Sequence, residues 1–147
     1  MRPLKTETMT DPLFQPLTIR HVTFKNRFMS TSHACGLEEG GMPKERYQRY
    51  HEEKARGGIG LTMFGGSSNV APDSPSVFQQ LYVGDDEVIP YLTQFSKRVH
   101  QYGASIMCQI THLGRRGEPY VGHWLPTIGP SAIRETLHRS FPKEMDD

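Results

Sequence analysis

The spacing of hydrophobic residues changes along this chain, and each change marks the boundary of an expected element. From residue 17 to residue 25, apolar and polar positions alternate around a short polar break. This period of two is typical of a small antiparallel hairpin with one buried face. Residues 11–17 include Pro12 and Pro16. Prolines lack an amide donor and push the preceding residue out of the helical region, so we expect extended chain there.

Three apolar runs have the length of buried β-strands. They comprise residues 26–32, 59–64 and 104–110. The second run is almost continuously apolar, which is typical of a strand in a parallel sheet that is covered on both faces. Residues 111–147 are rich in Gly, Pro and His and have no clear period, so we expect a long loop there.

The residues between the first two strands predict a helix over residues 43–56. Its first position is a proline, which a helix tolerates there, and the glycine pair at 57–58 supplies the stop. We expect one narrow stripe of this helix to be buried, because its larger apolar side chains share one face. These side chains are Tyr47, Tyr50 and Ala55.

A second helix is predicted between residues 85 and 102. Acidic residues 85–87 stand at its start, where unpaired amide donors and the helix dipole favour negative charge. Pro90 fits within the first turn, and Gly103 stands just past the end. The apolar positions recur with helical spacing. They are Val88, Leu92, Phe95, Val99 and Tyr102.

The order of expected elements is hairpin, strand, helix, strand, helix, strand and long loop. This alternation is typical of α/β folds, in which right-handed crossovers connect parallel strands. Two architectures fit three strands: a small open sheet, or the first three βα units of a TIM barrel, which typically needs about 250 residues. In the second case the hairpin precedes the barrel and closes its bottom, and the 147-residue chain is a fragment.

Composition narrows the possible functions. The chain is 35% hydrophobic and 22% charged, with a net charge of +1, which is typical of one soluble globular domain. Seventeen Lys and Arg residues against sixteen Asp and Glu leave no basic excess for a nucleic-acid partner. Residues 1–10 are polar, so we expect a flexible leader. Neither an export signal nor a membrane span is evident, and only two cysteines occur, so we expect a cytoplasmic protein.

Residues that could bind a ligand or take part in catalysis follow each of the three strands, at positions 32–36, 65–69 and 109–116. Working groups of α/β folds lie at the carboxyl ends of strands. The glycine pair at 65–66 would let a planar cofactor approach the backbone, although a tight turn is the commoner reason for glycines at a strand end. Gln109 offers both an acceptor and donors, which match the edge of a flavin's pyrimidine ring.

The histidines allow more than one interpretation. His112 and Arg115 could stabilise negative charge on a reduced flavin or a substrate carbonyl, or they could belong to a solvated basic loop. His33 could be a partly buried imidazole whose hydrogen bonds are satisfied within the protein. His33 and Cys35 lack further ligands at a suitable spacing, so we expect no metal site. Dinucleotide-binding, P-loop and GxSxG motifs are absent, which disfavours nucleotide-fold enzymes and hydrolases.

Five segments of the chain carry a resemblance to a known family. They are Leu13 to Leu17, Phe24 to Phe28, Ala55 to Leu61, Gln109 to Arg115 and Gly129 to Ser131. Together they resemble the amino-terminal part of the old yellow enzyme family of FMN-dependent barrels, and the resemblance covers most of residues 11–147. Within that family, the chain is similar to the branch of 2,4-dienoyl-CoA reductase, trimethylamine dehydrogenase and the N-methylproline and dimethylglycine demethylases.

The resemblance implies a set of flavin contacts. Ser32, His33 and Ala34 would border the FMN, Gly66 would lie against it, and Gln109 would bond its pyrimidine edge. His112 would sit beside the flavin or substrate and is the candidate catalytic residue. Ala34 stands where the amine dehydrogenase attaches its flavin through cysteine, so we expect noncovalent FMN. The full-length protein would also carry FAD and a 4Fe-4S cluster outside this segment.

The function implied by the resemblance is oxidative N-demethylation of a small N-methylated amine or amino acid. Hydride would pass from the N-methyl carbon to flavin N5, and the resulting imine would hydrolyse to formaldehyde and the demethylated product. The alternative enzyme function is NAD(P)H-dependent reduction of an activated carbon–carbon double bond. A third alternative is a truncated, inactive partial barrel. We expect a small-molecule substrate, and a homo-oligomer is compatible with the sequence.

Overall fold

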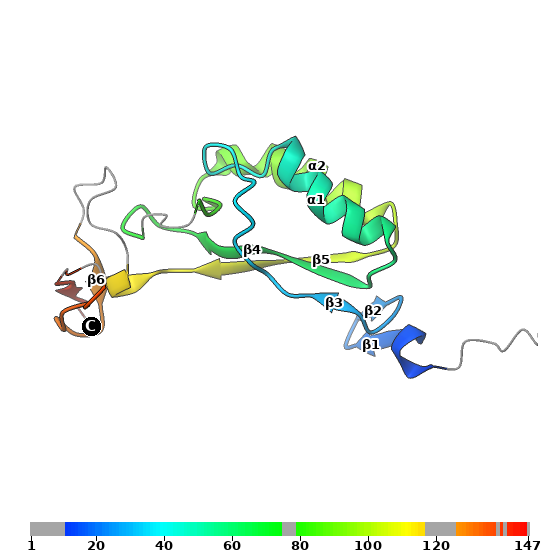
Figure 1. Cartoon of the computed structure of the whole chain (residues 1–147), viewed down its shortest axis with the longest axis horizontal. Coiled ribbons are helices and arrows are strands. Elements are labelled where there is room, and N and C mark those ends of the chain that lie inside the picture. Colours follow the sequence, from blue (N-terminus) through cyan, green and yellow to red (C-terminus); the bar gives the residue numbers. More distant parts are fainter. Residues whose placement is uncertain (1–10, 75–78, 117–125, 138, 140, 147) are drawn as a thin grey trace, which may run out of the picture.

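A computed structural model of the chain describes residues 11–74, 79–116, 126–137, 139 and 141–146. The expected leader, residues 1–10, lies outside the described residues. A three-stranded parallel sheet forms the centre, and two helices lie side by side on one of its faces (Figure 1). A two-stranded hairpin lies at one end of this sheet, and a short pair of strands lies near the other end (Figure 1).

The central sheet contains the three predicted strands in the order β3-β4-β5. They are β3 (Met29–Ser30), β4 (Leu61–Asn69) and β5 (Ser105–Thr111). The first strand is shorter than the predicted run, because only two of its residues pair with β4. The predicted end of the second strand at residue 64 is wrong. The strand continues through a β-bulge and then pairs with β5 again, which no apolar pattern could indicate.

The first helix, α1 (Glu45–Arg56), begins two residues later than predicted, with Lys44 at its N-cap. Its predicted buried stripe is wrong at Tyr50, which is only half-buried. The helix packs against both the sheet and the second helix, so its buried face is broader than one apolar stripe. That face includes polar side chains and consists of Tyr47, Gln48, His51, Glu52 and Ala55.

The second helix is confirmed as α2 (Ile89–His100), preceded by a 3-10 turn at Asp86–Val88. The Asp85 carboxylate accepts a hydrogen bond of 2.9 Å from the Glu87 amide and caps this turn. Phe95 and Val99 are fully buried on the face that meets the sheet. The acidic start and the apolar stripe therefore have the roles that the sequence predicts.

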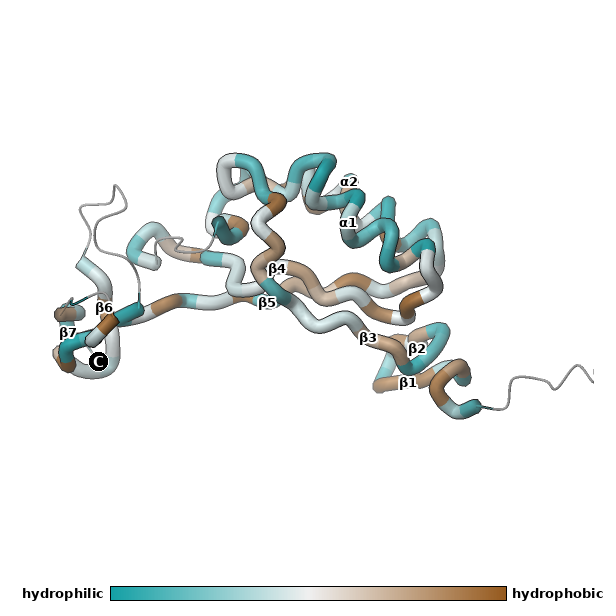
Figure 2. Tube along the Cα trace, viewed as in Figure 1, coloured by the Kyte–Doolittle hydropathy of each residue, from teal (hydrophilic) through white to brown (hydrophobic). Residues whose placement is uncertain are grey.

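The hydrophobic core lies between the sheet and the helices. Phe64 of β4 meets Phe95 of α2 with ring centroids 5.0 Å apart. The opposite face of the sheet is not covered by the described residues, and Met29 and Met107 on it are 50% and 44% exposed. Figure 2 shows that the helices consist largely of hydrophilic residues, whereas the strands beneath them are more apolar. Only one of the two sheet faces is thus buried in the described part of the chain.

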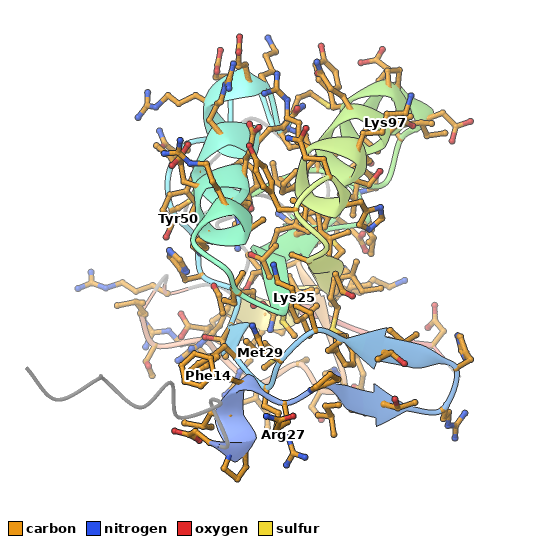
Figure 3. The ribbon with its side chains drawn as sticks, turned by 90° about the vertical axis from the view of Figure 1, so that its right-hand side faces the viewer. Phe14, Lys25, Arg27, Met29, Tyr50 and Lys97 are labelled. Atoms are coloured by element: carbon orange, nitrogen blue, oxygen red, sulfur yellow. The ribbon has the colours of Figure 1, made fainter. Side chains whose placement is uncertain are left out.

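The predicted hairpin is confirmed as β1 (Leu17–Ile19) and β2 (Val22–Phe24), paired antiparallel. Its expected buried face is wrong within the described residues, since Ile19 is 54% exposed. After the hairpin, Lys25 lies between the hairpin and the helical layer (Figure 3), where its Nζ donates a hydrogen bond of 2.7 Å to the carbonyl of Tyr102. This bond connects the residue after the hairpin to the turn that follows α2.

Two segments expected to be irregular contain short elements. A 3-10 helix at Pro12–Phe14 replaces the expected extended chain, because Asp11 caps it by accepting a hydrogen bond from the Leu13 amide. The expected long loop contains β6 (Ile128–Gly129) and β7 (Lys143–Glu144), which pair in parallel, and a 3-10 helix at Gly114–Arg116. Among the described residues, no helix has the length and apolarity that a membrane span requires.

Candidate functional site

The carboxyl ends of β3, β4 and β5 meet at one edge of the sheet, and a glutamine side chain joins them. Oε1 of Gln109 accepts a hydrogen bond of 2.7 Å from the Ser32 hydroxyl. The same oxygen accepts one of 3.0 Å from the Ser67 amide. Ser32 follows β3, Ser67 lies in β4 and Gln109 in β5. The three sequence clusters are thus brought together as the parallel topology requires.

The hydrogen bonds of Gln109 also fix which end of its amide group remains for a ligand. A backbone N–H can only donate, so the atom facing the Ser67 amide must be the oxygen. With two bonds, this oxygen has used both of its lone pairs. Nε2 has no hydrogen bond within the described residues, and the side chain is exposed. The sequence suggests that Gln109 presents an acceptor and donors to a ligand, but the structure leaves only the donors.

Gln109 lies on the face of the sheet that the helices do not cover. Side chains alternate between the two faces of a strand, and Ile106 and Cys108 pack against the helical core. Met107 and Gln109 therefore point to the opposite face, and both are exposed. A ligand bound by Gln109 would occupy this helix-free side of the sheet.

A β-bulge shapes the middle of this edge. Phe64 pairs with Cys108 and Ser68 pairs with Ile110. Three residues of β4, at positions 65–67, thus stand opposite a single residue of β5. All three have positive φ angles of 108°, 54° and 78°, which lie in the region that favours glycine. The bulge bends the strand locally and changes the direction of its backbone beside Gln109.

The glycines of the bulge are required by the protein itself. A Cβ on Gly66 would collide with the peptide group that joins His33 to Ala34. A Cβ on Gly65 would lie 2.5 Å from Ser68 Oγ and 2.6 Å from the Gln109 carbonyl oxygen. The close neighbour of each glycine is therefore the chain, so the glycine pair alone does not indicate a planar ligand. It belongs to a bulge within the strand, and the tight turn considered from the sequence is wrong.

His33 points away from Ser32 and toward the helical layer. Its Nε2 is 2.8 Å from the hydroxyl of Tyr50 in α1, and the two rings meet edge to face. Tyr50 projects from the side of α1 that faces away from α2 (Figure 3). The His33 imidazole is thus engaged on the helix side, while Ser32 bonds Gln109 on the helix-free side. Near the bulge, His33 and Ala34 contribute their backbone.

His112 links the loops that follow β4 and β5. Its Nδ1 accepts a hydrogen bond of 3.0 Å from the Gly114 amide. An accepting Nδ1 carries no proton, so the hydrogen of the neutral ring is on Nε2, which faces Asp73 Oδ1 at 3.3 Å. Both ring nitrogens are therefore occupied within the protein. Arg115, the other sequence candidate here, is exposed in the 3-10 helix after β5.

Tyr47 belongs to this site although the sequence reasoning treats it only as a core residue. Its hydroxyl oxygen accepts a hydrogen bond of 3.0 Å from the Gly65 amide, and the contact is buried. Burial raises the pKa of Tyr47, so the hydroxyl stays protonated at neutral pH. The sequence could have indicated that Tyr47 makes a hydrogen bond, because a tyrosine on a buried helix face needs a partner for its hydroxyl. The sequence could not indicate which partner.

The two cysteines are free and half-buried. Burial raises the pKa of the Cys108 thiol, although a contact of 3.7 Å to the Ser68 hydroxyl acts in the opposite direction. A protonated thiol is a poor nucleophile and a poor metal ligand. No three His, Cys, Asp or Glu side chains gather as a metal site among the described residues.

Comparison with known proteins decides the family. Residues 12–147 match the NADH:flavin oxidoreductase / NADH oxidase family. The chain belongs to this family. The resemblance to old yellow enzyme-like proteins is thereby confirmed.

Individual relatives agree with the family match. The chain is 58% identical over 142 residues to the "Multifunctional alkene reductase/demethylase OYE" of Caballeronia cordobensis, covering 97% of this chain and 21% of that protein. It is 48% identical over 137 residues to the "Probable N-methylproline demethylase" of Rhizobium meliloti (strain 1021), covering 93% of this chain and 20% of that protein. The chain thus spans about a fifth of the length of these curated relatives.

A solved structure establishes the likeness in fold. A complex of 2-naphthoyl-CoA reductase superposes with a TM-score of 0.81 at 21% identity, over 92% of this chain and 22% of that one. This family member therefore has the α/β arrangement of one part of that reductase. The predicted α/β class is confirmed, and the chain is a partial segment of a barrel-type fold.

Proposed function

We propose that the full-length protein is an FMN-dependent oxidoreductase that removes an N-methyl group from a small N-methylated amine or amino acid. The observation that carries this proposal is the junction at Gln109, where three parallel strand ends meet and the amide donors on the helix-free face have no partner among the described residues. In this interpretation β3, β4 and β5 are the first three strands of a TIM barrel, and the uncovered face is its interior.

The described residues fit one edge of a flavin. The Nε2 hydrogens of Gln109 would meet an acceptor of the pyrimidine ring, and the oxidised ring offers carbonyl oxygens there. Ser32 holds the Gln109 amide in place, and the backbone at Gly66 and at His33–Ala34 would border the ring system. Ala34 offers no sulfur for a covalent link, so the FMN would be held noncovalently. When bound, FMN supplies the hydride-accepting chemistry that side chains lack.

The imidazole rings of His33 and His112 bond other groups of the protein, whereas the resemblance implies that both residues lie beside the flavin. The His33 imidazole bonds Tyr50, and the His112 ring bonds Gly114 and faces Asp73. We therefore assign His112 the role of holding the loop after β5, with no proton transfer through its ring. The residue that handles the substrate proton lies outside these contacts.

The substrate class is inferred from the relatives. The Rhizobium meliloti protein is named for N-methylproline demethylation, and its name supports an N-methylated amino acid as substrate here. Oxidation of the N-methyl carbon gives an imine, whose hydrolysis releases formaldehyde and the demethylated product. FAD and a 4Fe-4S cluster in the full-length protein are proposed from the resemblance alone.

Reduction of an activated carbon–carbon double bond is the second candidate function. It is favoured by the relative at 58% identity, whose name includes both alkene reductase and demethylase. The same FMN-binding site would serve either reaction, because both need a hydride carrier beside a small substrate. The direction of hydride transfer and the source of electrons distinguish them.

Anaerobic flavin bleaching of the full-length protein tests the proposal. N-methylproline or dimethylglycine should bleach the visible flavin band without NAD(P)H and release formaldehyde. Proline and glycine are matched controls that lack the N-methyl group and should leave the band unchanged. If neither amine bleaches the flavin, and a dienoyl thioester rapidly reoxidises prereduced protein, alkene reduction is the activity. Full-length protein that retains no flavin would contradict both functions.

A further inference from the structure

Tyr47 reaches from the helical layer into the backbone of β4 at the point where this strand is irregular. The residue is 3% exposed, and its ring packs edge to face against Phe95 at 5.9 Å between centroids. Its hydroxyl oxygen accepts the hydrogen bond of 3.0 Å from the Gly65 amide. This contact joins α1 to the first residue of the bulge.

The bulge needs such a partner. In a regular strand, backbone amides donate to a neighbouring strand, and a buried amide without any acceptor is strongly unfavourable. At the bulge, three residues of β4 face one of β5, so the ladder is interrupted. The Tyr47 hydroxyl accepts from the amide at one end of the bulge, and the Gln109 side chain accepts from the Ser67 amide at the other. Two side chains thus replace the missing ladder bonds.

The conformation of the bulge determines where the proposed flavin contacts lie. The backbone of Gly66 touches the His33–Ala34 peptide group, and the Ser67 amide holds the oxygen of Gln109. A change in the bulge would therefore displace both the glycine surface and the Gln109 amide group. Since φ is positive at all three bulge residues, this conformation depends on its surroundings to persist.

We infer that Tyr47 is a positioning residue of the FMN site, because its hydroxyl holds the β4 bulge in the conformation that presents Gly66 and Gln109 to the flavin. This inference rests on the proposed function. Tyr47 does not touch the ligand in this arrangement. It lies on the helical side of the sheet and acts through the Gly65 amide.

Tyr47→Phe in the full-length protein tests the inference, since it removes the hydroxyl and keeps the ring. We expect the FMN Kd to rise about three- to tenfold, in line with the loss of one hydrogen bond. Amide hydrogen exchange at Gly65 should become faster, while exchange at Val99 in the core of α2 stays the same. A general loss of stability would instead accelerate exchange at both residues.

Tyr91→Phe is the matched control. It makes the same chemical change on α2, and the Tyr91 hydroxyl has no hydrogen bond among the residues that the structure describes. We expect this variant to keep the wild-type FMN Kd and the wild-type exchange at Gly65. An equal rise in Kd in both variants would overturn the inference.

A wild-type measurement covers the case in which Tyr47→Phe does not fold. Coupling between two sites is reciprocal, so FMN must slow amide exchange at Gly65 if the bulge conformation favours FMN. Unchanged Gly65 exchange upon saturation with FMN overturns the inference, and so does an unchanged FMN Kd in Tyr47→Phe. A wild-type protein that binds no FMN overturns the proposed function as well, which distinguishes the two failures.

Discussion

Ser32 and Gln109 are 77 positions apart in the chain, and the Ser32 hydroxyl donates a hydrogen bond of 2.7 Å to Oε1 of Gln109. This bond spans the edge of the sheet, since Ser32 follows β3 and Gln109 lies in β5, with β4 between them. The Ser67 amide of β4 bonds the same oxygen. One carboxamide oxygen thus joins three strand ends, while the amide donors of the same group have no partner in the part of the chain that the structure describes.

The donor role of Gln109 predicts different results for two substitutions. Gln109→Glu keeps an acceptor for Ser32 and Ser67 but has no N–H, so the strand ends should stay joined while FMN binding weakens about tenfold or more. Gln109→Ala removes both functions and should weaken FMN binding at least as much. Fluorescence titration of the full-length apoprotein with FMN gives the Kd, with the exposed Gln94→Ala in α2 as control. Wild-type affinity in Gln109→Glu would contradict the donor role.

Gly66 should tolerate no side chain, even apart from any ligand. Gly66→Ala would press its Cβ into the His33–Ala34 peptide group at a φ of 54°. We expect it to destabilise the protein by about 3 kcal/mol or more, measured by urea unfolding. Gly114→Ala is the matched control: φ is 56° and the nearest contact is an ordinary 3.5 Å to the Ile128 carbonyl, so only about 1–2 kcal/mol of backbone strain is expected. Equal losses would contradict the steric argument.

Because His51 is buried, we expect the free energy of unfolding to decrease in mild acid. It is 2% exposed, and burial, with smaller effects of Lys54 and His33, lowers its pKa from 6.5 to about 3. Between these values the unfolded chain binds a proton that the folded protein excludes. His51 therefore decreases the free energy of unfolding as pH falls below 6.5, by at most about 1.4 kcal/mol per pH unit.

Urea unfolding at pH 7 and pH 5 checks this expectation. In His51→Gln, which cannot titrate, the drop between the two pH values should be smaller than in the wild type. Thr62→Val removes the hydroxyl 2.7 Å from His51 Nδ1 but keeps the ring buried. It should lower stability at both pH values and keep the pH dependence. An identical drop in the wild type and His51→Gln would contradict a buried neutral imidazole.

The buried ion pair between the helices should contribute more than an exposed pair. Arg98 Nη1 of α2 is 3.0 Å from Glu52 Oε2 of α1, and the two side chains are only 18% and 9% exposed. A double-mutant cycle with alanine at both positions should give a coupling energy of about 1.5 kcal/mol or more. The exposed Arg56–Glu53 pair is shorter, at 2.6 Å, yet should give less than about 1 kcal/mol. The reverse order would contradict burial as the deciding factor.

The sequence was a good guide where local patterns determine structure. The acidic residues before α2 and its apolar spacing predicted that helix, because capping and burial of one face are local properties of the chain. It was a poorer guide for α1, where His51 and Glu52 are buried against the sheet and α2. Polar residues of that kind have no periodic signal, because partners from distant segments make their burial possible.

The sequence indicated which segments meet at the candidate site but not the contacts between them. The three strand-end clusters predicted which segments would meet, since parallel strands end at one edge. The sequence did not show that the His33 ring would turn toward Tyr50, that Asp73 would face His112, or that Tyr47 would bond Gly65. Each of these contacts joins residues whose proximity depends on how the helices pack on the sheet.

By itself, the sequence determined the α/β order of elements and the family, because both are recorded in residue types at fixed spacings along the chain. Only the tertiary structure decided that β4 carries a bulge, that glycine is needed there for contacts with the protein's own backbone, and that Ser32 and Ser67 occupy the acceptor oxygen of Gln109. The physical reason is that hydrogen-bond capacity and free volume at a position are set by its neighbours in space. In this site the neighbours come from segments tens of residues apart.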